Sequence, residues 1–143
     1  MKSYDELKDH YGVKELRSEH ENRMLSDFGS VVFCSEFPSY TSPFWNMKKK
    51  NDTHSNKIDV ILYGNETIGS AERSSNPAEM RQEFHSISGG KYAGLLFKLF
   101  GQDRVEKELE EFLSLPFFPR VGGGIGMTRM ISAMKQKEEN GIK

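Results

Sequence analysis

The amino-acid sequence predicts a single α+β domain covering residues 1–143. Two β-branched or aromatic runs and one hairpin pattern occupy residues 30–73, and helical patterns lie before and after them. Strand and helix signals that are segregated along a chain in this way are typical of the α+β class. A length of 143 residues suits one compact domain and is too short for two full-sized folds.

The composition is that of a soluble globular chain. Apolar residues make up 36% of the sequence, and 20 basic against 21 acidic residues give a net charge of −1. This balance excludes nucleic-acid binding by bulk electrostatics. The single cysteine, Cys34, excludes an intrachain disulfide and a Cys-rich zinc site. No segment resembles a signal peptide or reaches the roughly 18 apolar residues of a membrane span, so we expect a cytoplasmic protein without a membrane partner.

The first helix is predicted directly after the N-terminus. Ser3 and Glu6 have the spacing of a capping box, and Gly12 is a suitable stop. Residues 14–27 are polar with few apolar anchors, and we expect about half of them to be helical.

The pattern then changes to that of strands. Residues 30–34 (SVVFC) predict a buried strand, and the proline-containing residues 36–40 predict a turn. Residues 41–47 (TSPFWNM) predict a second strand, placed at an edge because Pro43 cannot donate a ladder hydrogen bond. Residues 48–56 are polar and predict a loop.

A hairpin is predicted between residues 57–63 and 66–73. The intervening Gly64-Asn65 is a turn sequence, and two registers are compatible with it. One has Tyr63-Gly64 as the turn and the other has Gly64-Asn65.

Helices dominate the next forty residues. Asn76 can cap a helix whose first residue is Pro77, and the glycines at 89–90 end it. Residues 95–100 suggest further helical turns, and residues 103–114 form a strongly amphipathic helix. The apolar stripe of this last helix comprises Val105, Leu109, Phe112 and Leu113.

A glycine-rich strand that leads into a helix is predicted near the C-terminus. Gly122, Gly123, Gly124 and Gly126 remove side chains where a backbone or a flat ligand comes close. Arg129 follows at the start of the helix, where the dipole favours an anion, so this cation needs an anionic or aromatic partner. Tight backbone packing alone also explains such a pattern.

Asp59 and Glu66 are the first candidate functional pair. Both hairpin registers place them on one face of the sheet, and the Tyr63-Gly64 register makes them diagonal neighbours at about 7–8 Å. Two carboxylates at that distance can share a divalent cation such as Mg²⁺, which prefers oxygen ligands. The alternative is that both are ordinary solvent-facing acids.

Arg73 is the next candidate. It lies seven residues beyond Glu66, and an odd spacing along a flat strand puts two residues on opposite faces. A bulge, which we expect at Gly69-Ser70, would bring Arg73 to the face of the acids. There its guanidinium could hold a carboxylate or phosphate; otherwise it forms a surface ion pair with a nearby acid.

Two segments together resemble a known family. Residues 122–129 (GGGIGMTR) resemble motif 3 of class II aminoacyl-tRNA synthetases. Residues 57–73 (KIDVILYGNETIGSAER) resemble the aspartyl and asparaginyl subgroup, with Asp59, Glu66 and Arg73 at its spacing. Shorter similarities are found at residues 73–77 (RSSNP), 37–38 (FP) and 43–47 (PFWNM). The blocks occur in the family's order, and the resemblance runs from about residue 3 to residue 135.

The resemblance implies a fold and an activity. The fold is a mainly antiparallel sheet flanked by helices, and the reaction is ATP-dependent activation of aspartate or asparagine as an aminoacyl-adenylate. Asp59 and Glu66 would hold Mg²⁺, Arg73 would hold the amino-acid side chain with Ser70 nearby, and Glu66 and Arg129 would be catalytic. The ATP-binding residues would be Asp59, Glu66, Gly124, Gly126 and Arg129.

The chain also departs from the family pattern. Motif 1, motif 2 and an anticodon-binding domain are not recognisable, so we expect the C-terminal portion of a catalytic core, from a truncated, split or partial protein. Glu72 stands where the tRNA synthetases more often have Gln and is more like archaeal asparagine synthetases. Ammonia-dependent asparagine synthesis and a catalytically inactive nucleotide- or amino-acid-binding paralogue are therefore alternatives. Expected partners are aspartate or asparagine, tRNA through a missing domain, and a partner subunit or second copy.

Overall fold

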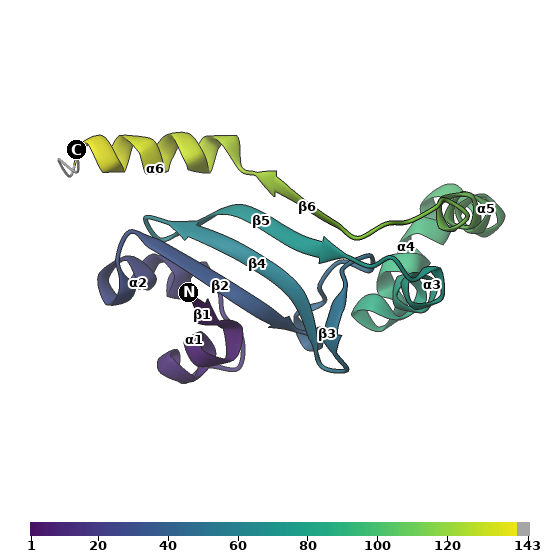
Figure 1. Cartoon of the computed structure of the whole chain (residues 1–143), viewed down its shortest axis with the longest axis horizontal. Helices are drawn as coiled ribbons and strands as arrows, with labels where there is room; N and C mark the ends of the chain where they lie inside the picture. The colour runs from purple at the N-terminus through teal and green to yellow at the C-terminus, as the bar shows by residue number, and fades with distance from the viewer. Residues whose placement is uncertain (140–143) are drawn as a thin grey trace.

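The computed structural model describes residues 1–139 as a six-stranded sheet with helices around it (Figure 1). The strand order is β1-β2-β4-β5-β6, with β3 paired to β4. Only β1 and β2 are parallel in this sheet, which confirms the expected mainly antiparallel α+β fold. The strands are β1 (Lys2–Ser3), β2 (Val31–Pro38), β3 (Lys49–Asn51), β4 (His54–Leu62), β5 (Asn65–Arg73) and β6 (Arg120–Ile125).

The helices form two groups. The α-helices are α1 (Tyr4–Tyr11), α2 (Ser18–Phe28), α3 (Pro77–Ser86), α4 (Lys91–Phe100), α5 (Gln102–Leu113) and α6 (Met127–Glu139). Figure 1 shows α1 and α2 beside β2, and α3, α4 and α5 gathered beyond the end of β5. Among the described residues, no helix has the length and apolar character needed to cross a bilayer.

The N-terminal capping box is confirmed. The Ser3 N–H donates to Glu6 Oε2 at 2.7 Å, and the Glu6 N–H donates to Ser3 Oγ at 3.2 Å. Gly12 ends α1 in the left-handed region, with φ of 64°. Helix α2 starts at Ser18, so the polar stretch from residue 14 is helical in its second part. These helices bury one apolar cluster against the sheet: Tyr4, Leu7, Met24, Val32, Cys34, Phe37 and Ile61.

The turn predicted at residues 36–40 is wrong for residues 36–38, where β2 continues, and the chain turns only at Ser39–Thr41. The pairing register shifts at Glu36, where φ is 62° and two residues of β4, Asn56 and Lys57, lie opposite one residue of β2, but the strand does not end there. Pro38 pairs with His54 at the strand end, where a missing N–H donor breaks little of the ladder.

The strand predicted at residues 41–47 is also absent. Residues 39–41 form a 3-10 turn, and only Met47 makes an isolated bridge, to Arg73. The Phe44 and Trp45 rings instead pack on Tyr92 and Phe84, with centroid separations of 5.7 Å and 5.5 Å. Burial of these rings against helices outweighs the β propensity of the aromatic run.

Residues 48–56, predicted as a loop, form a second hairpin between β3 and β4. Asn51 Oδ1 accepts the N–H groups of Thr53 and His54, each at 2.9 Å, and so closes the turn. The polar composition of residues 48–56 concealed this hairpin, since this segment carries no apolar alternation.

The hairpin of β4 and β5 has Tyr63-Gly64 as its turn, with φ of 48° and 77°. Leu62 pairs with Asn65, which selects the first of the two predicted registers. Further along, Ile61 pairs with Glu66 but Val60 pairs with Ile68, so Thr67 is the extra residue of a bulge. The bulge therefore exists, but two residues earlier than Gly69-Ser70, where it was predicted.

This bulge decides which side chains share a face. Beyond it, Asp59 pairs with Gly69 and Lys57 pairs with Ala71. Side chains that pair directly lie on the same side of a sheet, as do those two residues apart in a strand. One face, here called the site face, therefore carries Lys57, Asp59, Ile61, Glu66, Gly69, Ala71 and Arg73.

A second apolar cluster holds α3, α4 and α5 together. Asn76 caps α3 by accepting the N–H groups of Ala78 and Glu79, and Pro77 is its first residue, as predicted. The buried members of the cluster are Met80, Phe84, Ala93, Val105, Leu109 and Leu113. Phe112, from the predicted stripe of α5, packs against it in a partly buried position.

Phe112→Ala is expected to lower the free energy of unfolding by about 3 kcal/mol, at the low end for Phe→Ala because the ring is only partly buried. Its ring contacts Trp45 and Phe117 at 5.6 Å and 5.2 Å. Denaturant unfolding measures the effect. Phe118→Ala is the matched control, since Phe118 is 67% exposed and its loss should change little. Equal effects of both substitutions would contradict the placement of α5.

Candidate functional site

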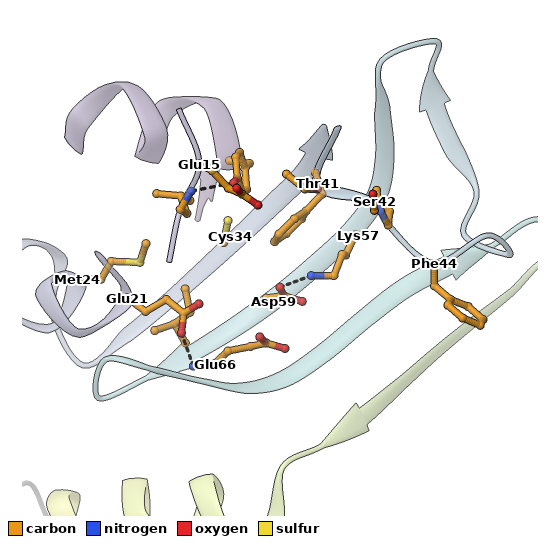
Figure 2. A pocket seen from close by; sticks show the side chains of 15 residues that line it. Glu15, Glu21, Met24, Cys34, Thr41, Ser42, Phe44, Lys57, Asp59 and Glu66 are labelled. Atoms are coloured by element: carbon orange, nitrogen blue, oxygen red, sulfur yellow. Dashed lines mark hydrogen bonds and ion pairs between the residues drawn. The ribbon is translucent and has the colours of Figure 1, made fainter. Parts of the chain in front are cut away.

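The carboxylates of Asp59 and Glu66 converge above Gly69. A Cβ atom built at Gly69 would lie 3.1 Å from Glu66 Oε1 and 3.4 Å from Asp59 Oδ1. Both oxygens therefore border one small space that only glycine leaves open. Figure 2 shows the two acids on neighbouring strands, facing the same side of the sheet. Glu66 pairs with Ile61, two residues from Asp59, so the two acids are diagonal neighbours, as the Tyr63-Gly64 register predicts.

Asp59 is almost completely buried, with 5% exposure. Burial raises the pKa of its carboxyl to about 6, and the neighbouring Lys57 ammonium only partly opposes this effect. Asp59 Oδ2 accepts a hydrogen bond from Lys57 Nζ, whereas no donor within residues 1–139 reaches Asp59 Oδ1. A buried, unpartnered carboxylate oxygen is costly and marks a place where a ligand fits.

Helix α2 contributes a third acid that the sequence patterns did not reveal. Glu21 Oε2 accepts the Glu66 backbone N–H at 3.2 Å, and burial raises the pKa of the Glu21 carboxyl. The signal in the sequence is weak, since Glu21 lies in the polar run of residues 18–23 and no pattern distinguishes it from its neighbours. Only the packing of α2 on the sheet brings it beside Glu66.

Arg129 reaches the same region from α6. Its Nη1 donates to the Glu66 carbonyl oxygen at 2.8 Å and lies 3.9 Å from Glu66 Oε2. The side chain is 57% exposed, so much of the guanidinium remains accessible. The Gly126 N–H donates to the Thr67 carbonyl oxygen at 2.9 Å, which fixes the start of α6 beside the β5 bulge. The anionic partner predicted for Arg129 is thus Glu66.

Glycines of β6 form a bare floor beside the acids. Gly124 pairs with Gly69, and no other atom lies within 4 Å of the position that a Cβ would take at Gly124. Gly122 pairs with Ala71, which also has only a small side chain. Between the acids and the end of β5 the site face therefore carries only glycine and the small, buried side chain of Ala71.

Arg73 lies at the far end of this floor. Its guanidinium donates to Asn46 Oδ1 at 3.1 Å and to the Gly122 carbonyl oxygen at 3.2 Å. A Cβ at Gly122 would lie 2.9 Å from Arg73 Nε, so glycine lets the arginine lie across β6. Arg73 lies four positions beyond Gly69, or about 13 Å along a strand. No acid among residues 1–139 forms the surface ion pair that was the alternative for Arg73.

Ser70 does not join these residues. It pairs with Ile58 on the opposite face, where its hydroxyl donates to the Ile58 carbonyl oxygen at 3.1 Å. Glu72 also points away from the site face and bonds Lys48 and Asn56. Of the residues predicted from the sequence, the fold therefore gathers Asp59, Glu66, Gly124, Gly126 and Arg129 at one end of the floor, places Arg73 at the other, and excludes Ser70.

A cavity of about 270 Å³ opens over the acids, between the sheet and the N-terminal helices (Figure 2). Lys57 lies in its wall, with its ammonium 3.6 Å from the centre of the Phe37 ring. Strand alternation alone places Lys57 on the face of Asp59, two residues away, so the sequence did contain this signal. The buried Cys34 thiol also lines the cavity, and burial raises its pKa to about 12, which keeps it protonated.

The acid pair fits a magnesium ion. Mg²⁺ takes oxygen ligands at about 2.0–2.1 Å and usually keeps several waters or phosphate oxygens, so two carboxylates suffice. Asp59 Oδ1 and Glu66 Oε1 are carboxylate oxygen atoms of the kind that could hold this ion, and the space above Gly69 lies between them. In residues 1–139, no cluster of three or more His, Cys, Asp or Glu side chains has metal-binding geometry, so an all-protein coordination shell is not built.

Comparison of sequences connects this geometry to characterised proteins. The family model described as tRNA synthetases class II (D, K and N) matches residues 1–140. An aspartate–tRNA(Asp) ligase of Pyrobaculum aerophilum is 29% identical over 117 residues. The match covers 81% of this chain but 24% of that ligase, so the chain spans about a quarter of the length of this curated relative.

Solved structures show the same fold. Asparaginyl-tRNA synthetase of Entamoeba histolytica in complex with asparaginyl-adenylate has a TM-score of 0.72 at 18% identity, covering 94% of this chain and 32% of that chain. For asparaginyl-tRNA synthetase of Pyrococcus horikoshii the TM-score is 0.69 at 18% identity, covering 93% and 32%. Aspartyl-tRNA synthetase of E. histolytica gives 0.66 at 18% identity, covering 92% and 28%.

Proposed function

Because this chain belongs to the class II tRNA synthetases (D, K and N), we propose that it forms the C-terminal portion of a catalytic core that activates aspartate or asparagine with ATP. The observation that supports this most strongly is the convergence of Asp59 Oδ1 and Glu66 Oε1 on the open space above Gly69. A glycine floor that ends at an arginine adds room for a ligand with a second anionic or polar end.

The proposed reaction is aminoacyl-adenylate formation. A carboxylate oxygen of the amino acid attacks the α-phosphorus of ATP and forms the new P–O bond, while the bond from that phosphorus to the bridging oxygen breaks and pyrophosphate leaves. Bound magnesium would neutralise phosphate charge. The task of the protein is to position the two reactants and to stabilise the developing charge.

Each candidate residue has a defined part in this proposal. Asp59 and Glu66 hold the magnesium ion, and Arg129 contacts the nucleotide with the exposed part of its guanidinium. Gly124 and Gly126 keep the floor and the start of α6 free of side chains. The Arg73 guanidinium has five N–H donors. Asn46 and Gly122 each accept one hydrogen bond from it, so further donors remain for the side chain of the amino acid.

The test is amino-acid-dependent exchange of radioactive pyrophosphate into ATP, with aspartate and asparagine compared. Exchange by the chain alone supports the proposal. Exchange only after addition of a second polypeptide supports it as one part of a split enzyme. Absence of exchange in both cases contradicts it and supports an inactive binding paralogue. Conversion of aspartate to asparagine with ammonia and without tRNA would instead establish the synthetase alternative.

Arg129→Ala is expected to weaken ATP binding about tenfold without changing the melting temperature. The guanidinium is accessible and contacts the rest of the fold mainly through the Glu66 carbonyl oxygen, so ligand contact outweighs structural contact. Isothermal titration with Mg-ATP and a thermal melt measure both quantities. A large loss of thermal stability without ligand would show that Arg129 is structural.

A further inference from the structure

Lys57 is fixed against the acid pair on two sides. Its ammonium donates to Asp59 Oδ2 and lies 3.6 Å from the centre of the Phe37 ring. Ala71, its partner across the ladder, is too small to shield it from the cavity. Figure 2 shows the lysine entering the cavity from the same side as both carboxylates. The side chain is 20% exposed, so water screens this charge only in part.

This placement changes the charge that a cation meets above Gly69. Glu21 and Arg129, which also lie beside Glu66, carry opposite charges and cancel. Asp59 and Glu66 then leave two negative charges, which Lys57 reduces to one. Lys57 also occupies one Asp59 oxygen and leaves the other, Oδ1, directed at the open space. A metal can therefore use Asp59 through a single oxygen.

We infer that Lys57 is a built-in counter-ion that keeps the affinity of the acid pair for a free divalent cation low, so that the cation binds together with the nucleotide. The joint binding of cation and nucleotide rests on the proposed function. The effect of Lys57 on a free cation does not. A triphosphate brings several negative charges and further oxygen ligands, which restore the charge that Lys57 removes. Lys57 then attracts the phosphates as well as repelling the free cation.

The experiment is titration of the chain with Mn²⁺ in the absence of nucleotide, followed by electron paramagnetic resonance. Lys57→Met keeps the length of the side chain and removes its charge. Even with water-like screening, a unit charge about 6 Å from a divalent cation changes its affinity about tenfold, so Lys57→Met should bind Mn²⁺ at least about tenfold more tightly than the wild type. Lys57→Arg keeps the charge and should retain the weak wild-type affinity.

Adding Gly69→Ala to Lys57→Met tests whether the gain in Mn²⁺ affinity arises at the acid pair. The added methyl fills the space between the two acids, so the gain should disappear. Unchanged or weaker Mn²⁺ binding by Lys57→Met, or equally tight binding by Lys57→Arg, overturns the inference. If a thermal melt shows that Lys57→Met is unfolded, Lys57→Gln replaces it with the same expected tenfold gain.

The two proposals fail separately. Nucleotide-free Mn²⁺ binding requires no catalysis, so a tenfold gain in a chain that lacks pyrophosphate exchange supports the role of Lys57 and counts against the activity alone. Exchange in the wild type with unchanged Mn²⁺ affinity in Lys57→Met refutes the counter-ion and leaves the activity standing.

Discussion

Asp59→Asn is expected to reduce pyrophosphate exchange roughly 10²–10³-fold, the cost typical of removing one group that stabilises charge in a transition state. The amide has no negative charge, so the oxygen next to Glu66 Oε1 ceases to be a strong magnesium ligand. Exchange is measured in whichever preparation supports it, the chain alone or the complemented chain. Ser70→Ala is the control, because Ser70 lies on the opposite face and its loss should leave exchange nearly unchanged.

The same substitution should stabilise the fold at neutral pH by about 1–2 kcal/mol. Burial raises the pKa of Asp59 from 3.8 to about 6, so the native state binds more protons than the unfolded state between these values. The free energy of unfolding of the wild type therefore falls as pH rises from about 4 to about 6. Above about pH 6 the cost of burying the ionised carboxyl is complete. That pKa already includes the attraction of Lys57, so the shift corresponds to at most about 3 kcal/mol. Relaxation around the buried charge reduces the penalty below this limit.

Thermal melts at pH 4 and pH 7 measure this effect. The Asp59→Asn variant and the wild type should melt at similar temperatures at pH 4, where the buried carboxyl is protonated, and the variant should melt higher at pH 7. A variant less stable than the wild type at pH 7 would show that the Lys57 pair outweighs the burial of the charge.

Gly69→Ala is expected to weaken magnesium-dependent ATP binding about 10–100-fold while leaving the fold intact, a range typical of changes next to a metal site. The new methyl would lie 3.1 Å from Glu66 Oε1 and 3.4 Å from Asp59 Oδ1, in the space assigned to the cation. Alanine is tolerated in a strand, and Gly69 has no positive φ that would strain it. Calorimetric titration with Mg-ATP measures the loss.

Gly94→Ala is the matched control for this variant. Gly94 lies in α4, far from the acids in the sequence, and no atom lies within 4 Å of its Cβ position. It should bind Mg-ATP like the wild type and gain up to about 1 kcal/mol of stability, since alanine favours a helix. If Gly69→Ala binds Mg-ATP with wild-type affinity, the metal does not bind in the space between the acids.

The placement of Asp59 and Glu66 on one face of the sheet could be predicted from the alternation of side chains along the strands. The turn beside Gly64 and strict alternation put Asp59 and Glu66 on one face whichever register formed. The same alternation includes Lys57, which escaped notice because lysine on a strand is ordinarily a solvated residue. For local features of this kind, short-range periodicity contains the necessary information.

The parts that were missed depend on contacts between distant segments. The bulge at Thr67 is fixed where the Gly126 N–H bonds its carbonyl oxygen, a contact across 59 residues that no local pattern shows. Glu21 reaches Glu66 only because α2 packs on the sheet. Residues 41–47 carry aromatic rings that suit a strand, but these rings pack on α3, α4 and α5.

The chain's single tryptophan belongs to the helical cluster and not to the cavity wall above the acids. Trp45 packs on Phe84 and Phe112 with centroid separations of 5.5 Å and 5.6 Å, while the other apolar cluster lies beneath α1 and α2. Its fluorescence therefore reports when α3–α5 come apart, whereas far-ultraviolet circular dichroism reports on all helices and strands. Coincidence of the two melting curves is the criterion for cooperative unfolding of both clusters as one unit.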